Sequence, residues 1–149
     1  MELSEIYELC LKHKAVTTDS RDCPEGSIFF ALRGDNFDGN AYASKALEQG
    51  CAYAVVDEEQ YAVKGDPRYI LVKNSLDTMQ QLAHLHRVTL GLPVIQITGT
   101  NGKTTTKELV SAVLEKKYKT LHTEGNLNNH IGVPKTLLRL TGKHQVAVI

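Results

Sequence analysis

A single lysine lies in a run of small residues whose types could bind phosphate. The stretch TGTNGKTTTKEL, residues 98–109, follows an apolar run and precedes a charged amphipathic segment. Successive backbone N–H groups in a glycine turn and at a helix N-terminus form a concave site of positive partial charge. In such a loop the lysine contacts the β- and γ-phosphates of a nucleotide, and the following hydroxyl binds Mg²⁺. The residue types therefore predict a phosphate-binding loop that uses Lys103 and Thr104.

The spacing of this loop differs from the strict phosphate-loop pattern. That pattern has its first glycine at position 97, but the sequence has Ile97 there and its first glycine is Gly99. The alternative is a Gly-Asn turn ahead of a surface helix that carries an incidental lysine. We favour the phosphate site because an apolar strand, a glycine loop and a helical pattern follow one another in the order that such loops require.

Two other polar regions could bind a ligand or simply form turns. GNLNNHIGVP, residues 125–134, has three asparagines and one histidine within five positions, and these side chains offer many neutral donors and acceptors. The segments DSR, residues 19–21, and GDNFDG, residues 34–39, are similarly polar. Asn, Asp and Gly are common in turns, and residues 34–39 could form a hairpin-like loop. On residue types alone, a turn is the favoured interpretation of the asparagine-rich segment.

Composition excludes several classes of partner. The 149 residues contain 17 Lys and Arg against 17 Asp and Glu, so no basic surface of the kind that binds DNA, RNA or anionic lipid is expected. The three cysteines are widely spaced without a CxxC pair, which fits a reducing compartment. No apolar run approaches about 18 residues, and the acidic, amphipathic N-terminus is unlike a signal peptide. We expect a cytoplasmic monomer that binds small molecules and has neither a nucleic-acid partner nor a membrane span.

Strands and helices that must position these residues alternate along the chain, which predicts an α/β fold. Apolar runs predict buried strands at residues 27–32, 51–56, 68–72, 93–98 and 145–149. Helical spacing predicts helices at 75–90, 104–118 and 134–140, and another at 40–49 that Asn40 would cap. Residues between the last two helices are expected to form a loop. The helix after the phosphate loop is expected to pack on its sheet through Leu109, Val110, Val113 and Leu114.

A domain boundary is predicted near Gly91, because Gly91 and Pro93 would end the helix at 75–90. The predicted domains are residues 1–90 and residues 91–149, the second with a mainly parallel sheet. The last strand, which ends at Ile149, would have no neighbour in that sheet. We therefore expect the chain to be the front part of a longer protein.

Three stretches together resemble the Mur ligases of peptidoglycan synthesis. They are DSR with GSIFFALRGDNFDGNAYASKALEQGCAYAVV, then ITGTNGKTTTKEL, then TEGNLNNHIGVPKTLLRL, and they cover nearly the whole chain. A glycine loop that starts as at Gly99 is the usual form in this family. The asparagine-rich stretch is most similar to the member that adds D-alanyl-D-alanine to UDP-N-acetylmuramoyl-tripeptide. One departure is Asn40, where the family more often has histidine.

The resemblance implies roles for the polar residues by position. A small α/β N-terminal domain would bind the UDP-sugar end of the substrate through Asp19, Ser20, Arg21, Gly34, Asp35, Asp38 and Gly39. The start of a P-loop ATPase domain would bind ATP through Thr98, Gly99, Thr100, Asn101, Gly102, Lys103, Thr104 and Thr105. Thr104 would also bind Mg²⁺. Asn126, Asn128 and Asn129 would lie toward the muramoyl peptide.

The implied reaction is ATP-dependent formation of an amide bond through an acyl phosphate, with Lys103 and Thr104 as catalytic residues. One alternative is the related ligase that adds the third amino acid to UDP-N-acetylmuramoyl-dipeptide. Another is a non-catalytic module that only binds UDP-muramoyl peptide, because half of the family's ATPase site lies beyond residue 149. The 149 residues alone are expected to be inactive.

Overall fold

The computed structural model describes residues 1–13 and 15–149, which form two compact units, Met1–Leu82 and Ala83–Ile149. Each unit contains a parallel sheet with helices packed on it, so the predicted α/β class is confirmed. Helix α3 (Ser75–Leu90) contributes residues to both units and ends at Gly91, whose φ of 63° favours glycine. The boundary predicted at Gly91 lies just after this helix, whereas the two compact units divide within it, between Leu82 and Ala83.

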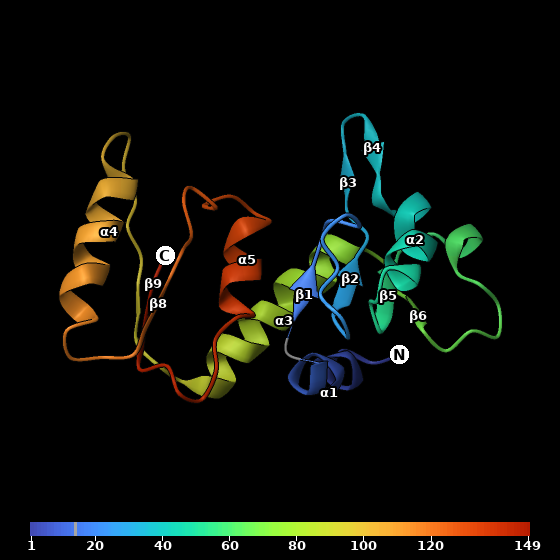
Figure 1. Cartoon of the computed structure of the whole chain (residues 1–149), viewed down its shortest axis with the longest axis horizontal. Helices are drawn as coiled ribbons and strands as arrows, with labels where there is room; N and C mark the ends of the chain where they lie inside the picture. The colour runs from blue at the N-terminus through green and yellow to red at the C-terminus, as the bar shows by residue number, and fades with distance from the viewer. Residues whose placement is uncertain (14) are drawn as a thin grey trace. The chain divides into compact units, whose positions relative to one another are not determined.

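The first unit is built on a four-stranded parallel sheet (Figure 1). Its strands, in the order β1-β2-β5-β6, are Val16–Thr17, Ile28–Phe30, Tyr53–Val56 and Tyr69–Leu71. The central strands β2 and β5 are buried on both faces, as continuous apolar runs predict for a parallel sheet. The short strand β1 was not predicted, because two residues carry no periodic signal.

The helices of this unit are α1 (Leu3–His13), α2 (Ala43–Glu48), the start of α3, and the 3₁₀ turns η1 (Gly39–Tyr42) and η2 (Glu59–Tyr61). The predicted helix at 40–49 is thus a 3₁₀ turn followed by a short α-helix. The prediction that Asn40 caps it is wrong: Asp38 is the cap, and its carboxylate accepts from the Asn40 backbone N–H at 3.0 Å. Asn40 itself is buried.

The second unit has a three-stranded parallel sheet in the order β7-β9-β8. The strands are β7 (Val94–Ile95), β8 (Thr120–His122) and β9 (Val146–Val148). The prediction that the last strand has no neighbour is wrong, because β9 pairs with β7 on one side and with β8 on the other. The error follows from β8, a three-residue strand in which only Leu121 is buried, which was expected to be loop.

Helices α4 (Lys103–Leu114) and α5 (Gly132–Leu137) flank this sheet, α4 against β8 and β9 (Figure 1). The predicted packing face of α4 is partly wrong. Leu109 and Val113 are 64% and 72% exposed, whereas Lys107 and Ser111 are buried against the sheet. Helical periodicity explains the buried pair, since residues four apart share one face. Of the four predicted packing residues, Val110 and Leu114 are half-buried, so hydrophobicity alone identified half of this face.

The core of the second unit contains a small apolar cluster and one buried histidine. Leu121, Leu140 and Ala147 are buried together, with Leu90 and Leu137 packed against them. Nε2 of His86, on the last turns of α3, lies 2.7 Å from the Leu140 carbonyl oxygen. In the described part of the chain, no helix is both long and apolar enough to cross a membrane.

Candidate functional site

The predicted phosphate loop connects β7 to α4, as such a loop requires. The Ile97 N–H donates to the Ile149 carbonyl at 2.8 Å, which continues the β7–β9 pairing to the base of the loop. Gly102 immediately precedes α4 with φ 77°, and Gly99 has φ 154°. Both values lie in the region that side chains rarely adopt, so the loop needs glycine at these two positions. The first N–H groups of α4 have no acceptor within the helix and face the loop, where an anion could bind.

Lys103 folds back over this loop. Its ammonium donates to the Gly99 carbonyl at 2.5 Å, and the side chain is half-buried. Residues 98–102 and Thr104 are exposed. A carbonyl is a weaker partner for an ammonium than a charged phosphate oxygen is. The loop can therefore exchange this internal hydrogen bond for a contact with phosphate.

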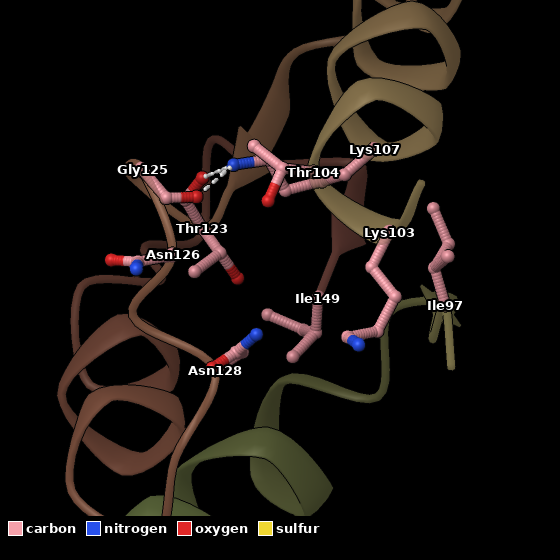
Figure 2. Close-up of a pocket in the computed structure, with 9 residues that line it drawn as sticks. All are labelled: Ile97, Lys103, Thr104, Lys107, Thr123, Gly125, Asn126, Asn128 and Ile149. Atoms are coloured by element: carbon pink, nitrogen blue, oxygen red, sulfur yellow. Dashed lines mark hydrogen bonds between the residues drawn. The ribbon is translucent and has the colours of Figure 1, made fainter. Parts of the chain in front are cut away.

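The phosphate loop and the asparagine-rich segment line one pocket (Figure 2). It is lined by Ile97, Lys103, Thr104, Lys107, Thr123, Gly125, Asn126, Asn128 and Ile149. Lys103 and Thr104 come from α4, and Asn126 and Asn128 come from the loop that follows β8. The structure thus brings four of the predicted site residues together at the carboxyl end of a parallel sheet, where α/β proteins commonly bind ligands.

Asn129 is not among the residues that line this pocket. Its side-chain oxygen accepts from the Ile131 N–H at 3.2 Å and from the Gly132 N–H at 2.7 Å, at the start of α5. Gly132 must be glycine because a Cβ there would lie 2.5 Å from the Leu127 carbonyl oxygen. This turn holds the loop in place, so the asparagine-rich segment combines a structural turn with pocket-lining amides.

Lys107 is a pocket residue that the sequence prediction missed. It is 4% exposed, and its ammonium donates to the carbonyls of Thr123 and of Gly125, the latter at 2.8 Å. It also pairs with the Glu108 carboxylate at 3.0 Å. The hydrogen bond and the charge of Lys107 lower the pKa of Glu108. The available signal was its position one turn after Lys103, on the face of α4 opposite the exposed Leu109.

In the first unit, residues 19–21 form a closed turn after β1. The Asp19 carboxylate accepts from the Arg21 side chain at 2.9 and 2.8 Å and from its backbone N–H at 2.9 Å. The Arg21 side chain is 83% exposed, whereas Ser20 is buried. The Thr17 hydroxyl donates to the Asp22 carbonyl at 2.7 Å and closes the turn from the other side.

Residues 33–38 form the predicted hairpin, with β3 (Arg33–Gly34) antiparallel to β4 (Phe37–Asp38). Gly34 and Asp35 are exposed, and the Phe37 ring stacks on Tyr42 with centroids 5.2 Å apart. Gly39 closes the base, because a Cβ there would lie 2.6 Å from the Leu32 carbonyl oxygen. The hairpin follows β2, and the turn at residues 19–21 follows its parallel neighbour β1. Both predicted UDP-binding segments therefore extend from the same edge of the sheet.

Asn40 and Asp57 form a buried link at this edge. The Asn40 amide donates to Asp57 at 2.9 Å and to Asp38 at 2.8 Å, and its oxygen accepts from the Asp57 N–H at 3.0 Å. Asp57 also accepts from the Ser75 N–H at 3.0 Å and pairs with Arg33 at 3.1 Å. Burial raises the pKa of Asp57, but hydrogen bonds from Ser75, Asn40 and Arg33 outweigh it, so the pKa lies below its ordinary value. Asp57 is a single acidic residue after a strand, so no spacing pattern predicts its role.

Two family models match the chain. Residues 12–87 match the model described as the Mur ligase family, catalytic domain. Residues 97–149 match the model described as the Mur ligase middle domain. Together the two matches include all the candidate site residues named above.

Individual relatives are similar over most of this chain. The UDP-N-acetylmuramoyl-tripeptide--D-alanyl-D-alanine ligase of Bacillus subtilis is 39% identical over 143 residues, which are 96% of this chain and 31% of that protein. The crystal structure of MurF from Acinetobacter baumannii matches with a TM-score of 0.82 and 37% identity, over 92% of this chain and 30% of that one. MurF ligase from Thermotoga maritima in complex with ADP matches with a TM-score of 0.80 and 29% identity, over 95% and 32%. The chain thus spans about 31% of the length of the Bacillus relative.

Proposed function

This chain belongs to the Mur ligase family, and we propose that it provides the substrate-binding front of a ligase that joins D-alanyl-D-alanine to UDP-N-acetylmuramoyl-tripeptide. In this proposal residues 1–90 bind the UDP-muramoyl peptide, and residues 91–149 are the first part of the ATP-binding domain. The relative of this name in Bacillus subtilis, 39% identical over 96% of the chain, supports the choice of substrates.

One observation carries the proposal: the phosphate loop and the asparagine-rich loop line the same pocket. A ligase of this kind must bring the terminal phosphate of ATP to the carboxylate of the acceptor peptide. Lys103 and Thr104 would contact the phosphate, and Asn126 and Asn128 the acceptor. A simple turn would explain asparagines at these positions, but it would not require them to face a phosphate loop.

The proposed reaction has two steps. An oxygen of the peptide carboxylate attacks the γ-phosphorus of ATP, and the bond to the bridging oxygen breaks to give an acyl phosphate and ADP. The amine of D-alanyl-D-alanine then attacks the acyl carbon, loses a proton, and inorganic phosphate leaves. The first step brings two anions together, and unit charges 4 Å apart repel by about 4 kcal/mol at an effective dielectric constant of 20. The Lys103 ammonium and the N–H groups at the start of α4 would offset this repulsion.

The residues present fit a nucleotide phosphate and a magnesium ion. The loop has the glycine conformations, the lysine and the helix start that phosphate binding needs. A hydroxyl next to the lysine, as at Thr104, is the usual protein ligand for Mg²⁺ in such loops. When bound, Mg²⁺ would neutralise phosphate charge, with the Thr104 hydroxyl as one of its ligands. The Thermotoga MurF ligase, which was solved in complex with ADP, supports the proposal that this chain contributes to a nucleotide site.

The UDP end of the substrate is proposed to bind at the carboxyl edge of the first sheet. Asp19, Ser20 and Arg21 follow β1, and Gly34, Asp35, Asp38 and Gly39 belong to the hairpin after β2. Of these, the exposed Arg21 and the hairpin tip are available for ligand contacts, whereas Asp38 and Gly39 hold the hairpin base.

The proposal is tested by phosphate release from a longer ligase that contains this chain. Two substrate pairs are compared in the presence of ATP and Mg²⁺. One pair is UDP-N-acetylmuramoyl-tripeptide with D-alanyl-D-alanine, and the other is the dipeptide form with a diamino acid. Release with the first pair alone is expected. Release with the second pair alone would assign the chain to the ligase of the third amino acid, and release with neither would leave only a binding module.

A further inference from the structure

Thr123 has an unusual position at the floor of the pocket. It is 2% exposed, and its hydroxyl has no hydrogen-bond partner among the described residues. Figure 2 shows this hydroxyl directed into the space between Thr104, Asn128 and Ile149. Buried hydroxyl groups normally have a partner, so an unpaired one that faces a pocket is available to a polar group that enters the pocket.

The other polar groups around this space limit what that group can be. The polar side chains that line the pocket are two lysines, two threonines and two asparagines. All six can donate hydrogen bonds. The cavity volume is about 30 Å³, room for only one or two water-sized groups. The space therefore suits one end of a ligand that carries an anionic oxygen.

Lys107 explains why Thr123 keeps this orientation. Its ammonium has three donors, and these meet the carbonyl of Thr123 itself, the carbonyl of Gly125 and the carboxylate of Glu108. With all three donors engaged, Lys107 has no donor left for a ligand. It instead ties the end of β8 and the start of the asparagine-rich loop to α4, one turn after the phosphate loop (Figure 2).

We propose that the Thr123 hydroxyl binds an anionic oxygen of the substrates between the phosphate loop and the asparagine-rich loop, and that Lys107 is the residue that positions it. This inference rests on the proposed function. The oxygen could belong to the terminal phosphate of ATP or to the carboxylate of the acceptor peptide. Both have the same hydrogen-bonding chemistry, and the two sources are separated by experiment.

The test removes the hydroxyl and keeps the shape of the side chain. Thr123→Val is compared with Thr123→Ser, which keeps a hydroxyl, and with Ser111→Ala. Ser111 is a matched control because its hydroxyl is also buried without a partner in the described structure but does not line the pocket. The 149-residue chain is titrated with ADP and with AMP-PNP, each with Mg²⁺. The Michaelis constants for ATP and for the UDP-muramoyl tripeptide are measured in the ligase that carries the chain.

If the oxygen is that of the terminal phosphate, Thr123→Val weakens AMP-PNP binding by about tenfold and leaves ADP binding unchanged, as loss of one hydrogen bond to a charged acceptor predicts. If it is the acceptor carboxylate, only the Michaelis constant for the tripeptide rises, by a similar factor. In either case the affected constant, AMP-PNP affinity or the Michaelis constant for the tripeptide, stays close to wild type in Thr123→Ser. It is unchanged in Ser111→Ala.

Equal binding by wild type and Thr123→Val in every titration and assay would overturn the inference. So would equal losses for ADP and AMP-PNP, because these would indicate a general disturbance of the loop. Failure of the wild-type chain to bind either nucleotide would instead count against the proposed phosphate site. Thermal unfolding of the unliganded chain is an independent measurement: Thr123→Val is expected to raise the melting temperature, since it removes an unsatisfied buried hydroxyl.

Lys107→Met tests the positioning role. It should produce the same ligand-specific loss as Thr123→Val, but it should lower the melting temperature because two carbonyls lose their donor. Unchanged ligand binding by Lys107→Met would show that Lys107 does not position Thr123 for the ligand.

Discussion

Lys103 and Lys107 lie one helical turn apart on α4, yet their surroundings give them different roles. Lys103 lies at an exposed loop and donates to a single loop carbonyl that a phosphate oxygen could replace. Lys107 is buried, and its donors meet two carbonyls and a carboxylate. An ammonium that can exchange its partner can bind a ligand, whereas an ammonium with three fixed partners can only hold its neighbours.

Lys103→Ala is expected to reduce ATP-dependent ligation by the enzyme that carries this chain by at least about 10²-fold. The reason is the loss of the charge that offsets repulsion between the attacking carboxylate and the phosphate. Binding of UDP-muramoyl tripeptide should remain nearly intact, because the proposed UDP-binding residues lie in the other unit. Phosphate release and substrate titration measure the two effects separately.

The controls for this prediction are Lys116→Ala and Arg21→Ala. Lys116 is an exposed lysine just beyond α4, and its loss should change neither quantity. Arg21→Ala should show the reverse pattern and raise the Michaelis constant of the nucleotide peptide more than that of ATP. Equal loss of ligation and of nucleotide-peptide binding in Lys103→Ala would contradict the assignment of two separate sites.

At the scale of elements, Gly132 determines how closely the asparagine-rich loop approaches α5. A Cβ at this position would lie 2.5 Å from the Leu127 carbonyl oxygen and 2.8 Å from the Leu127 Cβ. Gly132→Ala should therefore lower the free energy of unfolding by about 1–3 kcal/mol, the usual cost of overpacking. Gly142→Ala is the matched control, since a Cβ built at Gly142 would have no atom within 4 Å outside the adjacent residues. Thermal unfolding of both variants tests the prediction. Equal melting temperatures would show that the loop accommodates the added methyl group with no loss of stability.

Asp57 links three elements of the first unit, and its contribution should depend on pH. The pKa of Asp57 in the folded chain lies below the ordinary value of 3.8. The ionised carboxylate therefore stabilises the fold above that pH, and this stabilisation is lost as the pH falls through the folded-state pKa. Asp57→Asn should lower the free energy of unfolding by about 1–3 kcal/mol at pH 7, because the amide keeps one acceptor oxygen and its NH₂ group cannot accept the hydrogen bonds made to the other.

The difference between wild type and Asp57→Asn should shrink as the pH falls below 4, where the wild-type carboxylate also becomes neutral. Denaturant unfolding at pH 7 and at lower pH values measures this change. Asp35→Asn, at the exposed tip of the hairpin, should have little effect at any of these pH values. A difference for Asp57→Asn that stays constant with pH would show that the geometry of the side chain, and not its charge, stabilises the link.

Several elements could be predicted because their signal is local. Helix α3 matches its predicted range, and the central strands lie within the predicted apolar runs. Strand β8 and the buried face of α4 could not be predicted in this way. Leu121 is the one buried residue of β8, and Lys107 and Ser111 are buried on α4 only because strand and loop carbonyls lie opposite them. Such positions depend on tertiary contacts that a single sequence does not encode as a periodic pattern.

The candidate site shows the same division between local and tertiary information. The glycine loop, Lys103 and Thr104 follow a spacing that has a chemical reason, so residue types were enough to propose them. Thr123 has no such spacing, and Lys107 has only its place one helical turn after Lys103, so both become candidates only when β8 is placed beside α4. The grouping of Asn126 and Asn128 with the loop also depends on the β7-β9-β8 strand order, because it brings both loops to one edge of the sheet.

At the scale of the whole molecule, the 149-residue chain is expected to bind nucleotide but not to complete the reaction. Its pocket provides donors for phosphate and carboxylate oxygens. The chain also spans 31% of the Bacillus subtilis ligase that it resembles. Binding of the terminal phosphate of ATP does not by itself position the amine of D-alanyl-D-alanine, which must attack the acyl carbon.

A coupled assay for ADP tests this last prediction. The chain is incubated with ATP, Mg²⁺, UDP-N-acetylmuramoyl-tripeptide and D-alanyl-D-alanine, and the longer ligase that carries it serves as the positive control. The chain should give no ADP above the rate seen without the acceptor, while titration still detects nucleotide binding. ADP formation that requires both the tripeptide and D-alanyl-D-alanine would mean that these residues hold a complete active site. The roles assigned to Lys103, Thr123 and the two asparagines would then have to account for the whole reaction, including activation of the amine.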